Sequence, residues 1–258
     1  MSLMMVTMVF LQFVRAKASA DRIQDVLNTE VDLVNPVTPI TEVADGSIQF
    51  KNVSFYYPGS ENATLKNITF NIQPGEVFGI LGATGSGKSS LLSLIPRLYD
   101  VSEGQVLVGG NDVRDYDLET LRDAVSIVLQ QNTLFSGTIR ENMHWGDEQA
   151  SDEEIIEALK HAQAWEFVSK LADGLDHHVE QGGSNFSGGQ KQRLCIARSL
   201  IKHPKVLILD DSTSAVDMDT DAKIRRSFAN DYPNITKIII AQRIASIENA
   251  DHILVLDE

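Results

Sequence analysis

Apolar residues cluster along the chain in short runs separated by polar turns, and their spacing indicates which element each run forms. Strand-like runs lie at Ser47–Phe55, Gly75–Leu81, Gln105–Val108, Ala124–Leu129, Lys205–Leu209, Lys237–Ala241 and His252–Leu256. Helical patterns lie at Lys88–Leu98, through most of Thr138–Leu200 and at Ala222–Asn230, and Ser151 with Glu154 predicts a capping box. Because strands and helices alternate, the pattern predicts an α/β fold whose mainly parallel sheet has helices on its faces.

The first 34 residues differ from the rest of the chain, because an apolar run, Met4–Val14, precedes a polar segment with a helical apolar stripe. The run is too short to cross a bilayer, which needs about 20 residues, and no basic segment precedes it as in a signal peptide. Two interpretations remain: an amphipathic N-terminal helix, or the cytoplasmic end of a membrane-spanning helix whose earlier part is missing. We favour the second. Pro36 and Pro39 then mark a linker to a globular domain at 35–258.

Charge and cysteine content narrow the range of partners and compartments. The chain has 36 acidic and 22 basic side chains and a net charge of -14, so it would repel a phosphate backbone. We therefore expect no nucleic-acid partner. The single cysteine, Cys195, excludes an internal disulfide, fits a reducing compartment and is interpreted as a core thiol.

The segment "GATGSGKSS", Gly82–Ser90, fits the phosphate-loop pattern G-x-x-x-x-G-K-[ST] between a strand and a helix. Glycines let successive backbone N–H groups point at phosphate oxygens, and the helix N-terminus adds its positive dipole end. Lys88 can reach the β- and γ-phosphates, and the Ser89 hydroxyl can bind Mg²⁺. The nucleotide-binding residues predicted in this loop are Gly82, Thr84, Gly85, Ser86, Gly87, Lys88, Ser89 and Ser90.

The run "VLILD" ends in Asp210, and a carboxylate at the end of a buried strand is costly unless it meets a cation. After a phosphate loop, this pattern predicts that Asp210 holds Mg²⁺ through a water.

About a hundred residues after the loop, "FSGGQKQR" forms a turn that enters a helix. This is a second arrangement that favours an anion.

Together these motifs resemble the ATP-binding cassette (ABC) family, and over roughly Ser19–Glu258 the chain looks like the nucleotide-binding domain of an exporter half-transporter. The resemblance implies a P-loop NTPase core, an N-terminal antiparallel β subdomain and an inserted helical subdomain at about 138–200. It also implies ATP and Mg²⁺, a transmembrane domain in the same full-length chain, and a place at the cytoplasmic face of a bacterial membrane. The family usually continues beyond this point, so we expect the C-terminus to be truncated.

Family roles carry over to individual residues. Tyr57 matches the aromatic residue that stacks on adenine, with Tyr56 as the competing candidate. Gln130 matches the glutamine that contacts Mg²⁺ and the attacking water, with Gln131 as the alternative. The residues that match the signature clasping the γ-phosphate of ATP held by a partner domain are Ser187, Gly188, Gly189 and Gln190.

Two positions of the hydrolysis site depart from the family pattern. The catalytic base is a glutamate in the family and Asp211 here, and the switch histidine is Gln242. Aspartate is one methylene shorter, and a displacement of about 1 Å can cost on the order of a hundredfold in rate. Gln242 can donate a hydrogen bond but cannot become cationic. We therefore expect one half of a heterodimeric exporter, of the bacterial multidrug type, with a weak site of its own and an intact signature for its partner.

The alternatives are an ordinary homodimeric exporter half, a regulatory module that binds ATP without turnover, and a soluble ABC ATPase. Soluble proteins of the chromosome or repair type carry long heptad coiled coils, which the sequence lacks. Translation-associated proteins have two cassettes and basic linkers, whereas this chain has one cassette and is acidic.

Overall fold

The computed structural model describes residues 2–210, 216–240 and 247–257, and the chain forms two compact units, Met1–Val34 and Asn35–Glu258. The first unit contains α1 (Ser2–Leu27), one continuous helix that includes both the apolar run and the polar segment after it. From Leu3 to Leu27 this helix is long and apolar enough to cross a membrane, and none of it is buried against protein. The predicted helix is thus confirmed, and it is longer than its apolar run alone indicates.

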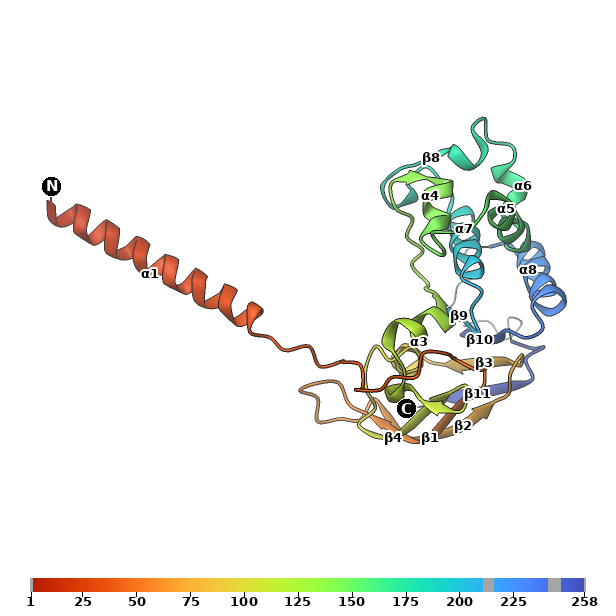
Figure 1. The fold of residues 1–258 in the computed structure, drawn as a ribbon, viewed down its shortest axis with the longest axis horizontal. Helices are drawn as coiled ribbons and strands as arrows, with labels where there is room; N and C mark the ends of the chain where they lie inside the picture. The colour runs from red at the N-terminus through yellow and green to blue at the C-terminus, as the bar shows by residue number, and fades with distance from the viewer. Residues whose placement is uncertain (1, 211–215, 241–246, 258) are drawn as a thin grey trace. The chain divides into compact units, whose positions relative to one another are not determined.

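The second unit is built around a parallel sheet in the order β11-β3-β10-β9-β6 (Figure 1). Its strands in that order are His252–Leu256, Val77–Gly82, Thr236–Ile240, Val206–Asp210 and Val125–Val128. All four strand pairs are parallel, which confirms the predicted α/β class. Strand β9, between β10 and β6, has four buried residues before its terminal aspartate, as expected for a strand covered on both faces.

A second, antiparallel sheet has the order β2-β1-β4-β5 and lies near the N-terminal side of the unit's sequence. Its strands in that order are Leu65–Ile72, Ile48–Phe55, Glu103–Val108 and Asn111–Asp112. Phe70 of β2 stacks between two rings. Its ring centroid lies 4.5 Å from that of Phe50 on β1 and 5.0 Å from that of Phe78 on β3. These rings join the two sheets into one apolar core that positions the strand leading into the phosphate loop.

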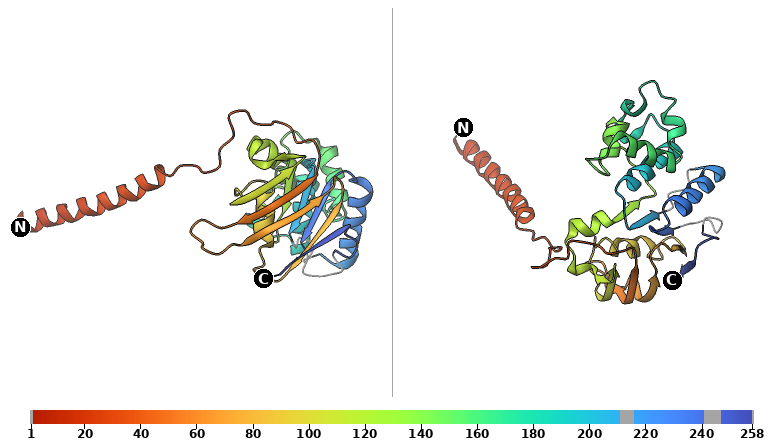
Figure 2. Two further views of the ribbon diagram at one scale, coloured as in Figure 1. Left: turned by 90° about the horizontal axis from the view of Figure 1, so that it is seen from below. Right: turned by 45° about the vertical axis from the view of Figure 1, so that its right-hand side comes forward.

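The segment between β6 and β9 forms a helical lobe, visible beyond the sheets in Figures 1 and 2. Its helices are α4 (Ile139–His144), α5 (Asp152–His161), α6 (Trp165–Val168) and α7 (Gly188–Ile201). The capping box predicted at Ser151 and Glu154 is confirmed. Residues 169–187 are not helical beyond short 3₁₀ turns, because Gly174, Gly182 and Gly183 have positive φ. That segment also pairs β8 (His178–Val179) with β7 (Gly137–Thr138).

The remaining helices are α2 (Lys88–Leu94), α3 (Leu118–Ala124) and α8 (Met218–Asp231). The prediction that the first of these reaches about Leu98 is wrong, because Pro96 lacks an N–H donor and Arg97 has φ 50°. Helix α8 begins earlier than predicted, because the Asp217 side chain accepts a hydrogen bond from the Thr220 N–H and caps it.

Candidate nucleotide-binding site

The candidate site lies where parallel strands end, at the edge where α/β sheets bind ligands. The carboxyl ends of β3 and β9 flank that of β10: Ile240 is paired with Ile80 on one side and with Asp210 on the other. Strand β6 joins the same edge, because Val128 is paired with Leu209, and Gln130 follows it on an exposed turn. The sheet therefore brings the phosphate loop, Asp210 and Gln130 to one edge.

Two of the loop's glycines leave no space for a side chain. Gly87 has φ 88°, and a Cβ there would lie 2.9 Å from Leu65 Cδ2 and 3.0 Å from the Thr64 carbonyl oxygen. Gly82 comes so close to the last strand that a Cβ would lie 2.6 Å from the Leu256 carbonyl oxygen. A Cβ at Gly85, by contrast, would meet nothing within 4 Å, so the tip of the loop faces open space that a ligand can enter.

Lys88, the first residue of α2, folds back over the loop. Its Nζ donates to the carbonyl oxygens of Gly82 at 2.8 Å and Ala83 at 2.6 Å, and lies 3.5 Å from Ser86 Oγ. The backbone N–H groups around it belong to the start of a helix, where the dipole favours negative charge. A cation and a helix N-terminus thus meet in one open loop, which is an arrangement suited to phosphate.

The side chains predicted to bind Mg²⁺ supply only oxygen atoms, which is the ligand type that this cation prefers. Ser89 is exposed on the first turn of α2, and Asp210 is half-buried at the end of β9. Within residues 2–210, 216–240 and 247–257, no three His, Cys, Asp or Glu side chains gather as a metal cage. Mg²⁺ is commonly bound by one or two carboxylates together with waters and substrate phosphates, and a set with one carboxylate, Asp210, beside the Ser89 hydroxyl and the Gln130 amide oxygen fits that mode.

The two departures, Asp211 and Gln242, lie outside the described residues. Asp211 directly follows Asp210 along the chain, and Gln242 follows the end of β10 by two residues. Their assignment as catalytic residues therefore stays a prediction.

Tyr57 lies beside the phosphate loop and is fixed by several contacts. Its hydroxyl and the Ser90 hydroxyl are 2.9 Å apart, within hydrogen-bond distance. Its ring packs roughly perpendicular to Phe55 and Tyr99, with centroids 4.8 and 5.3 Å away. The ring of the alternative candidate, Tyr56, is not part of this cluster. Sequence reasoning missed Tyr99, which is 42 positions after Tyr57 and carries no motif of its own.

The signature turn begins α7 on the helical lobe. The Ser187 hydroxyl accepts a hydrogen bond from the Gln190 N–H, and the Gln190 side chain accepts one from the Ser187 N–H. Ser187 and Gly188 are exposed, so this helix N-terminus is open to another molecule. Arg193 holds the helix within the lobe, because its guanidinium donates to the Gln163 carbonyl oxygen at 2.7 Å and lies over the Phe167 ring.

Comparison with protein families gives a match to the ABC transporter model over residues 65–214, more than half of the chain. The chain belongs to the ABC transporter family. In this ABC transporter chain, the match begins with β2 and includes the phosphate loop, the signature turn and β9. The ATP-binding cassette fold and ATP-hydrolysing domain expected from the sequence are thereby confirmed.

Several relatives of this ABC transporter chain are exporters or transporters by name. It is 47% identical over 246 residues to an uncharacterized ABC transporter ATP-binding protein, YfiB, of Bacillus subtilis, covering 95% of this chain and 42% of that protein. It is 41% identical over 247 residues to an ATP-dependent lipid A-core flippase of Haemophilus influenzae, covering 95% of this chain and 42% of that protein. A bacterial Atm1-family ABC exporter with ATP bound has 34% identity and a TM-score of 0.88, covering 98% of this chain and 45% of that one. The chain thus spans less than half the length of these relatives.

Proposed function

We propose that the chain is the ATP-binding part of an ABC exporter and couples ATP binding and hydrolysis to export across a bacterial membrane. The observation that carries the proposal is the phosphate loop, which closes around Lys88 at the sheet edge that also ends in Asp210. The likeness to a flippase and to an Atm1-family exporter supports export as the direction of transport.

In this proposal, each site residue has a defined task. Lys88 and the backbone N–H groups of Gly85–Ser89 bind the β- and γ-phosphates, and Tyr57 stacks on adenine. Ser89 and Asp210 would hold Mg²⁺, which neutralises phosphate charge when bound. Gln130 orients the attacking water at the end of β6.

We further propose that this chain's own phosphate loop forms a degenerate site. Asp211 has nearly the same intrinsic basicity as glutamate, with reference pKa values of about 3.9 and 4.3, so proton affinity does not decide its effect. The shorter side chain of Asp211 is what should lower the rate, because general-base catalysis needs the carboxylate within hydrogen-bond reach of the water. Gln242 can still hydrogen-bond to the γ-phosphate but cannot carry a positive charge.

The partner in this proposal is a second half-transporter that supplies a glutamate and a histidine. A head-to-tail pair places the phosphate loop of one chain against the signature of the other. The exposed Ser187–Gln190 turn of this chain would therefore complete the partner's site, and a heterodimer is favoured over a homodimer by the two departures together.

The first unit fits a membrane-spanning helix followed by a linker, with the second unit at the cytoplasmic face. Its helix has the length and composition to cross a membrane from Leu3 to Leu27. Side chains such as Phe10 and Leu11 are more than half exposed, and no neighbour covers them among the described residues. In this proposal, lipid would cover them.

A change at the start of the chain tests this placement. Phe10→Asp should move most of the chain from the pellet to the supernatant when liposome-bound protein is washed with alkaline carbonate, because a buried aspartate costs about 2.5–3.5 kcal/mol at a helix centre. Ser19→Asp, beyond the apolar run, should leave the chain in the pellet. Complete extraction of the unmodified chain by carbonate would favour an amphipathic surface helix instead.

Restoring the two family residues tests the degenerate site. The double variant Asp211→Glu with Gln242→His should raise the ATPase rate of the self-associated chain more than the two single changes together, because both groups act on one water and one phosphate. Steady-state phosphate release measures the rates, with Lys88→Ala added to each variant as the inactive control. Strictly additive gains, or none, would place the slow step elsewhere.

A further inference from the structure

Tyr99 lies between α2 and β4 and takes part in the aromatic cluster beside the phosphate loop. Its ring meets Tyr57 edge-to-face, with 5.3 Å between centroids and 86° between planes, and lies 5.6 Å from Phe55. The exposed fractions of Tyr99 and Tyr57 are 39% and 36%. The two rings therefore support each other at the surface, where an incoming base can reach Tyr57.

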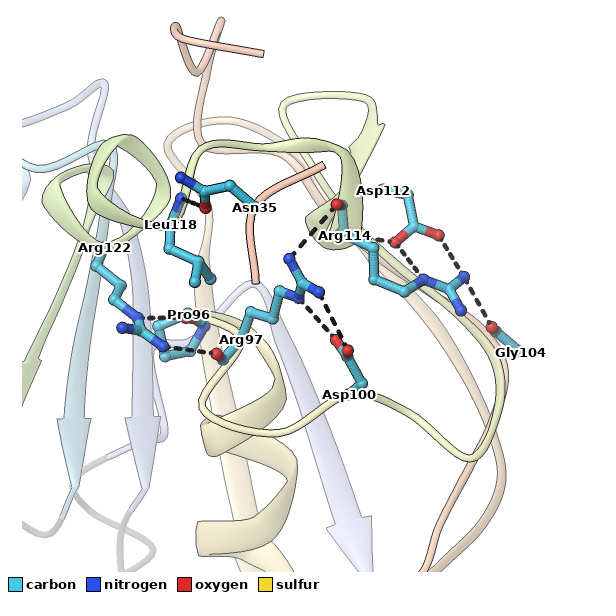
Figure 3. Close-up of polar contacts among 9 residues, drawn as sticks. All are labelled: Asn35, Pro96, Arg97, Asp100, Gly104, Asp112, Arg114, Leu118 and Arg122. Carbon is cyan, nitrogen blue, oxygen red and sulfur yellow. Dashed lines mark hydrogen bonds and ion pairs between the residues drawn. The ribbon is translucent and has the colours of Figure 1, made fainter. Parts of the chain in front are cut away.

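The segment that carries Tyr99 is closed by an ion pair between Arg97 and Asp100 (Figure 3). Arg97 Nε and Nη2 donate to the two carboxylate oxygens of Asp100 at 2.7 and 3.1 Å. Arg97 is only 6% exposed, and its carbonyl oxygen accepts a hydrogen bond from Arg122 of α3 at 3.0 Å. A guanidinium that binds both carboxylate oxygens fixes the geometry of the pair, so Leu98 and Tyr99 are held in a tight turn.

Tyr57 is thus held by contacts of different kinds. Its hydroxyl lies 2.9 Å from Ser90 on the first turn of α2, and two rings pack across it at steep angles. A side chain that is fixed before binding loses less conformational freedom when a ligand orders it. The orientation of the Tyr57 ring relative to the phosphate loop is therefore set before nucleotide arrives.

We propose that Tyr99 is a positioning residue for the base of a bound purine nucleotide. It holds the Tyr57 ring in the stacking orientation, and the Arg97–Asp100 pair holds Tyr99 in turn. The inference rests on the proposed function, in which Tyr57 stacks on adenine. Because the cluster acts on the base and not on the phosphates, Tyr99 contributes to binding ATP but not to binding a triphosphate that lacks a base.

The test compares two ligands, Mg-ATP and magnesium tripolyphosphate, by calorimetric titration of the full 258-residue chain in mild detergent. Tyr99→Ala should weaken Mg-ATP binding about two- to tenfold, the range for losing one aromatic pair, and leave tripolyphosphate binding unchanged. Tyr99→Phe retains the ring and should restore ATP affinity. If Tyr99→Ala lowers the melting temperature, Tyr99→Leu fills more of the space without the ring and should show the same ligand selectivity.

The ion pair offers a second measurement with a matched control. Asp100→Asn should weaken ATP binding in the same direction as Tyr99→Ala and spare tripolyphosphate, because it loosens the turn that presents Tyr99. Glu157→Gln removes the carboxylate of an exposed ion pair with Lys160 on α5, which is far along the chain from Tyr99, and should leave both affinities unchanged.

A double-mutant cycle decides whether Tyr99 acts through Tyr57. In a Tyr57→Ala background, Tyr99→Ala should cause no additional loss of ATP affinity. An independent loss there, or an equal loss for tripolyphosphate, would overturn the positioning role while leaving the phosphate loop assignment in place. Failure of the proposed function looks different: Lys88→Ala would then leave both ligands bound as tightly as before.

Discussion

Lys88→Ala should weaken Mg-ATP binding to this chain by about 10- to 100-fold, the range for losing charge-assisted hydrogen bonds of about 1.5–3 kcal/mol. The lysine ammonium already lies at the mouth of the loop, where it is held by the carbonyl oxygens of Gly82 and Ala83. Phosphate oxygens would take over these contacts when ATP binds. Tyr57→Ala should cost less, because it loses one stacking contact of about 1–3 kcal/mol, whereas the Lys88 ammonium makes more than one charge-assisted hydrogen bond.

Calorimetric titration with Mg-ATP measures both losses. Lys51→Ala serves as the control, because Lys51 is an exposed lysine on β1 and has no place in the proposed site. Unchanged affinity in Lys88→Ala would remove the basis for assigning Gly82–Ser90 as the phosphate loop. A loss in Lys51→Ala of the same size would instead point to a general effect of net charge.

Gly188→Asp in this chain should nearly abolish ATP hydrolysis by the assembled pair of half-transporters. Gly188 is the exposed first residue of α7, and in the proposed pair it faces the γ-phosphate held by the partner. A carboxylate there would repel that phosphate and block closure. The same substitution favours the helix itself, because an acidic residue in the first turn complements the dipole, so the loss would not reflect misfolding.

A change in this chain's own site should have a much smaller effect than one in the signature turn. Asp211→Asn should change steady-state phosphate release only modestly, because little of the flux passes through a degenerate site. Ser187→Ala should resemble Gly188→Asp, whereas Ser187→Thr keeps the hydroxyl that accepts from the Gln190 N–H and should retain most activity. If Asp211→Asn proves as damaging as Gly188→Asp, this chain's own site is a principal hydrolytic site, and the heterodimer proposal is wrong.

The sequence by itself determined the features that depend on neighbouring residues. The strand at His252–Leu256, the capping box at Ser151 and Glu154, and the start of α7 after Ser187 were all predictable, because side-chain alternation and local hydrogen bonds specify them. The phosphate loop was predictable for the same reason, since its glycines and Lys88 act within a few residues of one another. The roles of Asp211 and Gln242 stay predictions from the family pattern.

Tertiary structure decided what depends on residues far apart along the chain. The strand order β11-β3-β10-β9-β6 brings Asp210 and Gln130 to the edge of the phosphate loop, and no local pattern encodes that order. Helix α2 ends before Pro96 and the left-handed Arg97, and the Arg97 carbonyl oxygen is held there by Arg122 of α3, 25 positions later. That turn places Tyr99 against Tyr57, a contact between two packed segments. Such contacts form only when the sheets pack against each other, so nearest-neighbour preferences could not reveal them.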